Sequence, residues 1–338
     1  METVICHINL KNLTDNYLRI CELYKEKEVI AVVKDDAYNH GILNVTRELK
    51  KAGCNFFAVS NIKEAIYLRS NFKDIKIMTV GVSYLEDLNL YFENNIILNV
   101  WNKEMLESLL EYSHPLTIHI KINTGMNRLG VSKEDINKYL IPLSLKHQVE
   151  GIYTHLGNAC RELYQEEIKI FKEILTDLNY KFKVIHVNNS YSMLNHEKDL
   201  NFTTHVRPGI ALYGYYGFKP TFNLSTKIIS IRRLKRGERI GYNLEKLNRD
   251  VTIGLINIGY GQGFLRSNVN REVRINNKKY SLIGSICMDI SFILIDDDVK
   301  VGDDVYLFDD YYQAEKHLNT ITYEILCNIS KTIKKVYY

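Results

Sequence analysis

The sequence predicts an α/β fold in which an N-terminal (βα)8 barrel of the TIM type precedes a C-terminal, mostly antiparallel β domain. Eight short apolar segments alternate with amphipathic stretches over about the first 200 residues. Polar or glycine-containing stretches follow several of these segments, as expected where barrel strands end. From about residue 216 the strand-like segments follow one another without helical stretches between them.

The barrel strands are expected at residues 29–33, 56–60, 76–80, 96–100, 117–122, 151–156, 184–188 and 205–213. Amphipathic stretches such as 43–52 and 62–70 supply the crossovers that parallel strands require. Eight strand and helix pairs close a packed barrel. We place this barrel domain at residues 11–215.

The β domain is expected at residues 216–338. Its strands are predicted at residues 225–234, 251–258, 273–275, 280–286, 291–295 and 305–308, and a short helix at 323–330. The basic cluster at 232–236 is typical of a solvated hairpin tip.

Composition excludes several classes of protein. The chain has 44 Lys and Arg against 40 Asp and Glu, and a net charge of +4 does not indicate a nucleic-acid surface. No apolar run approaches the roughly 20 residues of a membrane span, and the first residues do not resemble a signal peptide. The six cysteines show no CxxC pair, so we expect free thiols in a reducing cytoplasm and no metal site.

Lys34 follows the buried-strand pattern of residues 29–33 and would lie at the mouth of the barrel. A surface lysine is one interpretation. The other is a Schiff-base lysine, because burial lowers the pKa of an amine and makes it nucleophilic.

Other strand ends carry groups that suit an anionic ligand. Ser190 and the backbone of Gly209 and Ile210 offer donors for a phosphate, although the same residues fit a simple tight turn. Arg128 lies on a glycine-containing loop, where a guanidinium can bind a carboxylate or a phenolate. His155 is either a supporting residue of the site or a hydrogen-bonded core histidine.

Eight motifs carry a resemblance that covers nearly the whole chain. They are AVVKDDAYNHG, KINTGMNRLG, HVNNS, VRPGIALYG, IGYN, IGYGQG, ICMD and ITYEILCNIS. In this order and spacing the sequence resembles the alanine racemases. The resemblance implies a pyridoxal 5′-phosphate enzyme whose first residues, 1–10, add a strand to the β domain.

The resemblance also assigns the cofactor site. Lys34 would bind the cofactor covalently, and Arg207 would face its ring nitrogen. The phosphate would be surrounded by Tyr38, Asn189, Ser190, Gly209, Ile210 and Tyr323. Because the pKa of arginine exceeds about 12, Arg207 would not transfer a full proton to the ring, which suppresses side reactions such as transamination.

Substrate contacts follow from the same resemblance. Arg128 and the Met288 backbone would bind the substrate carboxylate, and Lys121 matches a carbamylated lysine that supports this arginine. Racemisation needs two bases that flank the carbanion, and the resemblance implies that Lys34 and Tyr242 of the partner subunit would be this pair, in a homodimer with shared sites. The partner would also contribute Met288 and Asp289, and His155 would lower the pKa of the tyrosine.

Several positions depart from the family pattern. They are Asp35, Asp36, Asn39, Asn123 and Gln262, together with Cys160 and Ser285 in the substrate corridor, where His186 and Arg266 are retained. The expected activity is alanine racemisation that supplies D-alanine for peptidoglycan. The alternatives are a serine or broad-spectrum racemase, a decarboxylase of the same barrel family, and a non-catalytic cofactor-binding barrel.

Overall fold

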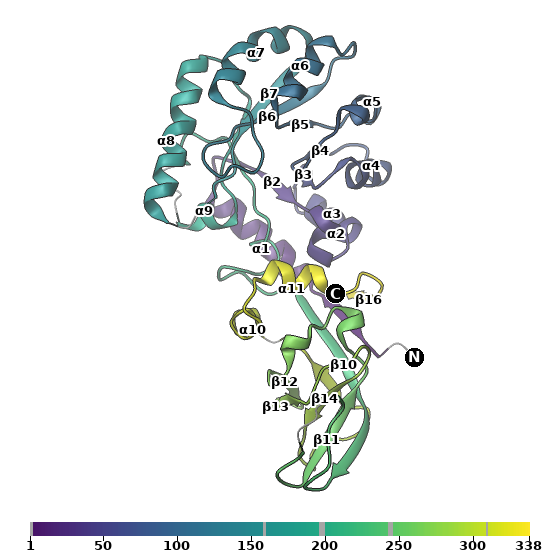
Figure 1. The fold of residues 1–338 in the computed structure, drawn as a ribbon. Helices are drawn as coiled ribbons and strands as arrows, with labels where there is room; N and C mark the ends of the chain where they lie inside the picture. The colour runs from purple at the N-terminus through teal and green to yellow at the C-terminus, as the bar shows by residue number, and fades with distance from the viewer. Residues whose placement is uncertain (1–2, 158–159, 196–199, 243–245, 309) are drawn as a thin grey trace. The chain divides into compact units, whose positions relative to one another are not determined.

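The computed structural model describes residues 3–157, 160–195, 200–242, 246–308 and 310–338 (Figure 1). The chain forms two compact units. The barrel unit comprises residues 12–37 and 41–220, and the β unit comprises residues 1–11, 38–40 and 221–338. The short segment Tyr38–His40 therefore packs with the β unit although it follows the first barrel strand in the sequence.

The barrel unit contains an eight-stranded parallel sheet. Its strands are β2 (Glu28–Val32), β3 (Phe56–Val59), β4 (Lys76–Thr79), β5 (Leu98–Val100), β6 (Thr117–Lys121), β7 (Gln148–Tyr153), β8 (Val184–His186) and β9 (His205–Val206). The strand order is β4-β3-β2-β9-β8-β7-β6-β5, and a parallel bridge between Met78 and Ile97 joins its two ends. The sheet is therefore closed, and the predicted (βα)8 barrel is confirmed.

Helices connect the barrel strands (Figure 1). They are α1 (Leu10–Leu23), α2 (Lys34–Asn39), α3 (Ile42–Lys51), α4 (Ile62–Asn71), α5 (Leu88–Glu93), α6 (Lys103–Glu111), α7 (Lys133–Lys146), α8 (Arg161–Leu178) and α9 (Ser190–Asn195). Side chains that accept a backbone N–H fix where several of them begin: Asn61 for α4, Asn102 for α6 and Ser132 for α7. Each of these helices buries an apolar stripe and exposes its polar positions.

The β unit contains a second eight-stranded sheet. Its strands are β1 (Ile5–Ile8), β10 (Phe222–Leu234), β11 (Val251–Ile256), β12 (Glu272–Ile275), β13 (Lys278–Ile283), β14 (Ser291–Leu294), β15 (Asp304–Tyr306) and β16 (Lys334–Tyr337), with helices α10 (Tyr311–Leu318) and α11 (Thr322–Asn328). β1 pairs antiparallel with β10 and parallel with β16, so the first residues join this sheet as the resemblance implied. The other strand pairs are antiparallel, which confirms the predicted class.

The structure differs from the sequence-based expectations in a few places. The strand expected at 205–213 is only β9, which ends at Val206, two residues before Pro208, and residues 210–214 form successive turns. The basic cluster is divided, with Arg232 and Arg233 inside β10 and Lys235 beyond its end. Helix α10 and strand β16 had no expected counterpart.

Candidate active site

Lys34 lies directly beyond the carboxyl end of β2 and is half-buried. The preceding residue, Val33, is fully buried, and its N–H donates to the Ala58 carbonyl at 2.9 Å. This bond to the end of β3 fixes where the chain leaves the barrel. The lysine is therefore at the barrel edge where the carboxyl ends of all eight strands gather, the edge that carries the active site in this architecture.

The short segment α2, which begins at Lys34, is left-handed. Residues 35–39 all have positive φ, between 52° and 65°, although none is glycine. A left-handed conformation costs about 1 to 2 kcal/mol per residue, so contacts around the turn must hold it. Asp36 supplies two of them, since its N–H donates to Glu64 Oε1 at 3.1 Å and its carboxylate accepts the Ile42 N–H at 2.8 Å. The aspartate at position 36, which departs from the family pattern, thus stabilises the strained turn beside the lysine.

Four cations act on one another at this edge. Lys121, the last residue of β6, is 3% exposed. Burial, and after it the positive charges of Arg128, Arg207 and Lys34, together lower its pKa to about 7. The same four residues, after burial, hold the pKa of His155 well below its ordinary value. The charge balance at this edge therefore favours an anionic ligand.

Arg207 is buried directly after β9 and is held from several sides. Its Nη1 donates to His186 Nδ1 at 2.6 Å. Its Nη2 donates to the Thr154 carbonyl and to His155 Nδ1, both at 3.2 Å. The Nδ1 atoms of His186 and His155 accept these bonds and are therefore unprotonated. The lowered pKa values of the two histidines agree with neutral rings.

Tyr153, the last residue of β7, packs between these groups. Its ring stacks on the His186 ring at 4.4 Å between centroids, and the Arg207 guanidinium lies 5.2 Å from its centre. The Lys121 ammonium nitrogen is 5.8 Å from the same ring. The aromatic face therefore stabilises two of the four cations that otherwise repel each other.

The Ser190 hydroxyl is held by backbone N–H groups of the segment after β9. Its hydroxyl oxygen accepts the N–H groups of Gly209 at 2.9 Å and Ala211 at 3.2 Å. Because these bonds occupy the oxygen's lone pairs, the hydroxyl hydrogen is directed elsewhere and can be donated to an anion. The side chain of Asn189 instead accepts the Ser192 N–H at 2.9 Å and orders the start of α9.

Arg128 is exposed on the loop that follows β6. Asn123 orders this loop, since its side-chain oxygen accepts the N–H of Gly125 at 3.3 Å and of Asn127 at 3.0 Å. Gly130 has a φ of +136°, and a Cβ there would lie 2.4 Å from the Asn123 nitrogen, so the loop requires glycine at that position. Asparagine at 123, another departure from the family pattern, thus performs a local structural role.

The remaining predicted residues lie in the β unit. The rings of Tyr38 and Tyr323 are 5.8 Å apart, so these two predicted phosphate neighbours are brought together. Tyr242 is 76% exposed and Met288 is 56% exposed. The Met288 carbonyl accepts the Gly261 N–H at 2.9 Å, and Asp289 is exposed beside it.

The four residues expected in the substrate corridor lie in different parts of the structure. His186 is wrong as a corridor residue, because it is 0% exposed and bonded to Arg207 in the barrel interior. Arg266 and Ser285 line one cavity of about 810 Å³ in the β unit. Cys160 is exposed in the barrel unit.

Residues inside the barrel were missed by the sequence analysis. His119 and Tyr153 lie under the site, fully or almost fully buried, and Glu150 is buried with them. A signal existed for His119, because side chains alternate along a strand and it precedes Lys121 by two positions on β6.

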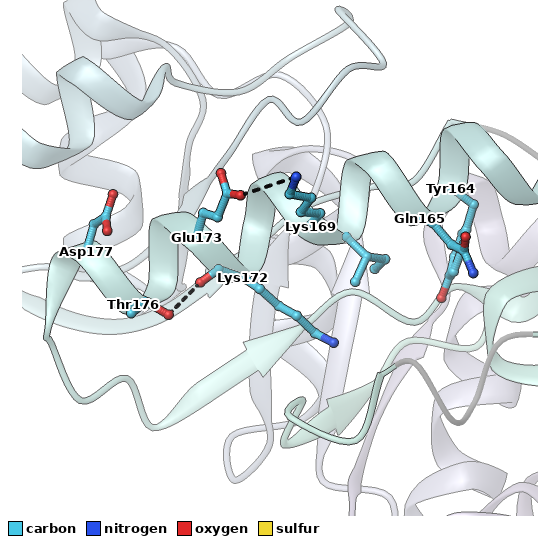
Figure 2. Close-up of a pocket in the computed structure, with 8 residues that line it drawn as sticks. Tyr164, Gln165, Lys169, Lys172, Glu173, Thr176 and Asp177 are labelled. Carbon is cyan, nitrogen blue, oxygen red and sulfur yellow. Dashed lines mark hydrogen bonds and ion pairs between the residues drawn. The ribbon is translucent and has the colours of Figure 1, made fainter.

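A hollow of about 480 Å³ along α8 is separate from this group of residues (Figure 2). Figure 2 shows polar side chains of one helix, with Lys169 and Glu173 paired at 4.0 Å. None of the predicted site residues lines it. Among the described residues, no cluster of histidine, cysteine and acidic side chains could hold a metal ion, and no helix is long and apolar enough to cross a membrane.

Comparison with known proteins identifies the family. The model of the alanine racemase N-terminal domain matches residues 8–217, and that of the alanine racemase C-terminal domain matches residues 221–337. The chain is 32% identical to the alanine racemase of Staphylococcus epidermidis, over 98% of this chain and 94% of that protein. It is 33% identical to the alanine racemase of Helicobacter pylori, over 98% and 97%.

Solved structures give the same result. The alanine racemase of E. faecalis superposes with a TM-score of 0.93 at 29% identity, covering 100% of this chain and 98% of that one. The alanine racemase of Bartonella henselae, solved with covalently bound pyridoxal phosphate, superposes with a TM-score of 0.92 at 25% identity and full coverage of both chains. The matched domains span both units of the structure, and the chain therefore belongs to the alanine racemase family.

Proposed function

We propose that this protein is a pyridoxal 5′-phosphate-dependent racemase that interconverts L- and D-alanine. The observation that carries the proposal is the lysine at the barrel mouth together with three further cations, Lys121, Arg128 and Arg207. The lysine amine can bind the aldehyde of the cofactor. The surplus of positive charge suits the cofactor phosphate and the substrate carboxylate.

The residues present fit the cofactor. Ser190 offers a hydroxyl hydrogen to a phosphate, because its oxygen is already held by the N–H of Gly209, next to Ile210. Arg207 offers a guanidinium whose contacts to His186 and His155 leave it protonated, which suits an unprotonated ring nitrogen. The bound cofactor withdraws electrons from the Cα of an amino acid and so makes its hydrogen acidic.

The chain supplies the proton transfers. The Lys34 amine takes or returns the Cα proton on the face of the D-enantiomer, and the hydroxyl of Tyr242 of the partner subunit does so on the opposite face. Arg207 donates a hydrogen bond but keeps its proton, since its pKa is far above that of a pyridine. His155, which accepts from Arg207 through Nδ1, has its ring hydrogen on Nε2 and can donate it to the tyrosine oxygen, which would lower the pKa of that tyrosine.

The substrate carboxylate is bound by Arg128 and the Met288 backbone in this proposal. Lys121 positions Arg128 after conversion to a carbamate. Its lowered pKa, about 7, supports this role, because only the neutral amine adds to carbon dioxide. The new N–C bond releases one proton from the amine and creates a carboxylate that neutralises one of the neighbouring cations.

We further propose a homodimer with shared sites. The exposure of Tyr242 and Met288, both large side chains with apolar parts, supports their insertion into a partner's site. Asp289 lies next to Met288 and would belong to the same interface. The absence of a CxxC pair among the six cysteines of the sequence supports a reducing, cytoplasmic location, and supply of D-alanine to peptidoglycan is the corresponding physiological role.

Alanine is the proposed substrate in preference to serine or to larger amino acids. Tyr323 would crowd the substrate methyl group, and its ring packs against Tyr38. A basic amino acid would bring a further positive charge to an edge that already holds Lys34, Arg128 and Arg207. A decarboxylase is disfavoured because Arg207 would leave the ring nitrogen unprotonated.

Borohydride trapping tests the proposed cofactor site. The purified protein should absorb near the edge of the visible range, and reduction should fix the cofactor on the peptide that contains Lys34. Lys103, an exposed lysine on α6 paired with Glu107, offers a matched control. Lys103→Ala should be labelled like the parent protein, and Lys34→Ala should not be labelled. A label that remains in Lys34→Ala at another lysine would contradict the assignment.

A further inference from the structure

A chain of buried polar side chains runs through the barrel interior away from Arg207. His186 Nε2 lies 3.1 Å from His119 Nδ1, and His119 Nε2 lies 3.4 Å from Glu150 Oε2. Glu150 Oε1 accepts from the Lys76 ammonium at 2.9 Å. Together with the 2.6 Å bond from Arg207 to His186, these contacts link the carboxyl ends of the barrel strands to Lys76, the first residue of β4.

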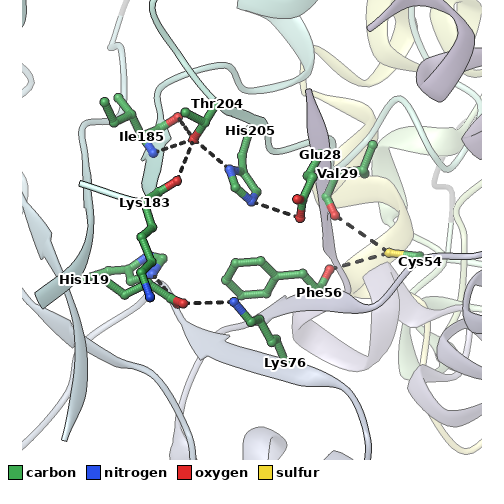
Figure 3. Close-up of polar contacts among 11 residues, drawn as sticks. Glu28, Val29, Cys54, Phe56, Lys76, His119, Lys183, Ile185, Thr204 and His205 are labelled. Carbon is green, nitrogen blue, oxygen red and sulfur yellow. Dashed lines mark hydrogen bonds and ion pairs between the residues drawn. The ribbon is translucent and has the colours of Figure 1, made fainter. Parts of the chain in front are cut away.

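The two ends of this relay differ in exposure. His186 and His119 are both 0% exposed, whereas the Lys76 side chain reaches solvent. Figure 3 shows this outer end, where the Lys76 ammonium nitrogen lies 5.6 Å and the centre of the His119 ring 6.0 Å from the centre of the Phe56 ring. We call the five residues Arg207, His186, His119, Glu150 and Lys76 the barrel relay.

The chemistry of the two ends gives the relay one direction. Arg207 has only donors, so His186 Nδ1 must be an acceptor and its hydrogen is on Nε2. His186 Nε2 then donates to His119 Nδ1, which places the hydrogen of His119 on Nε2 as well. His119 Nε2 donates to the Glu150 carboxylate. Every bond between Arg207 and Glu150 therefore points toward Glu150, and each neutral imidazole presents a lone pair to the group before it.

Charge and packing agree with this direction. The bond from His119, and then the bond from Lys76, lower the pKa of Glu150 to about 2, so it is a carboxylate that can only accept. Burial lowers the pKa of both relay histidines and favours neutral rings. The His119 ring occupies the space beside Gly151, where a Cβ would lie 2.7 Å from it.

We propose that Glu150 and His119 are positioning residues for Arg207. The Glu150 carboxylate fixes the hydrogen of His119 on Nε2, His119 does the same for His186, and the His186 lone pair thereby aligns the Arg207 guanidinium. The assignment of hydrogens stands on this structure alone. The consequence for catalysis rests on the proposed function, because it requires that Arg207 face the cofactor ring.

Glu150→Gln is a specific probe of this relay. Glutamine has one side-chain oxygen, and Lys76, which has only donors, competes for it. The amide NH₂ then faces His119 Nε2, moves the hydrogen of His119 to Nδ1 and, through it, moves that of His186 to Nδ1. Two donors would then oppose each other between His186 and Arg207. Adding Lys76→Met removes the competitor, frees the amide oxygen for His119, and should restore the original hydrogens.

Nitrogen-15 NMR of histidine-labelled holoenzyme measures these positions directly, with His119→Gln and His186→Gln used for assignment. The parent protein should show both relay histidines protonated on Nε2. In Glu150→Gln a measurable share of His186 should become protonated on Nδ1, and Glu150→Gln/Lys76→Met should return to the parent pattern. Glu28→Gln is the matched control, because Glu28 lies at the same end of the barrel but contacts His205, at 3.4 Å, instead of the relay. It should leave His186 unchanged.

Racemisation kinetics give a second readout. Loss of one charge-assisted hydrogen bond should lower kcat about tenfold in Glu150→Gln, with recovery in the double variant. A parent His186 protonated on Nδ1, or a Glu150→Gln spectrum identical to the parent spectrum in a folded protein, would overturn the inference. The parent spectrum decides the matter even where Glu150→Gln does not fold. The NMR result does not depend on racemase activity, so failure of the proposed function is distinguished from failure of the relay.

Discussion

Lys121 should make the stability of this protein rise with pH. The side chain is almost fully buried, and burial together with three neighbouring cations lowers its pKa from 10.5 to about 7. Replacing it by methionine retains an unbranched side chain of similar length but removes the charge. Lys121→Met should therefore be more stable than the parent protein at low pH, and this advantage should shrink as the pH rises.

The sign and size follow from proton binding. Between pH 7 and 10.5 the unfolded chain retains the lysine proton that the folded protein has lost, so unfolding takes up a proton and its free energy rises with pH. Below about pH 7 both states are protonated and the full cost of burying the charge is present. A tenfold change in acidity is worth about 1.4 kcal/mol, so the full difference is on the order of 5 kcal/mol, of which roughly 3 kcal/mol falls between pH 7 and 9.

Denaturant unfolding of the cofactor-free protein, at several pH values in buffer without carbon dioxide, measures this difference. Lys103→Met, on the exposed surface of α6, controls for the loss of a lysine and should follow the parent protein. A constant free-energy difference between parent and Lys121→Met from pH 6 to 9 would refute the reasoning. With ¹³C-labelled bicarbonate, a carbamate signal should appear in the parent protein and be missing from Lys121→Met.

Three further predictions address the reaction. Lys34→Ala should abolish racemisation in both directions, because it removes the covalent anchor and one base; near-normal loss of optical signal in a circular-dichroism assay would exclude this role. Mixing Lys34→Ala with Tyr242→Phe should restore part of the activity, since some heterodimers contain one intact site; no recovery after demonstrated subunit exchange would exclude shared sites. On a panel of L-alanine, L-serine, L-lysine and L-arginine, kcat/KM should be highest for alanine. The value for serine should be lower by a factor that corresponds to roughly 1 to 3 kcal/mol of activation free energy; a higher kcat/KM for lysine or arginine than for alanine would indicate a broad-spectrum enzyme.

The sequence predicted the barrel well because its evidence is local. Several barrel strands, such as Ile30 to Val32 in β2, are short apolar runs bounded by polar residues. The position of Lys34 at the barrel edge then followed from a general property of parallel barrels. The residues expected to contact the cofactor and the substrate were assigned from the family resemblance, and those assignments stay predictions.

The missed features depend on contacts between distant residues. Strand β16 has a mixed sequence, Lys334 to Tyr337, and becomes a strand only by pairing with β1 at the other end of the chain. The left-handed turn after Lys34 requires bonds from Asp36 to Glu64 and Ile42, which no local pattern reveals. Only the family resemblance assigns His186 to the substrate corridor, whereas its partners are Arg207, which follows the neighbouring strand β9, and His119 on β6, two strands away across the barrel interior.

The most direct test of the proposed function is the approach to equilibrium from both enantiomers. L- and D-alanine have equal free energies in water, so a racemase must bring either pure enantiomer to the same optically inactive mixture while the total alanine concentration stays constant. We expect this result from the purified protein loaded with pyridoxal 5′-phosphate, with no reaction in Lys34→Ala. Unchanged optical signal from both enantiomers, or a loss of alanine accompanied by released carbon dioxide, would contradict the account.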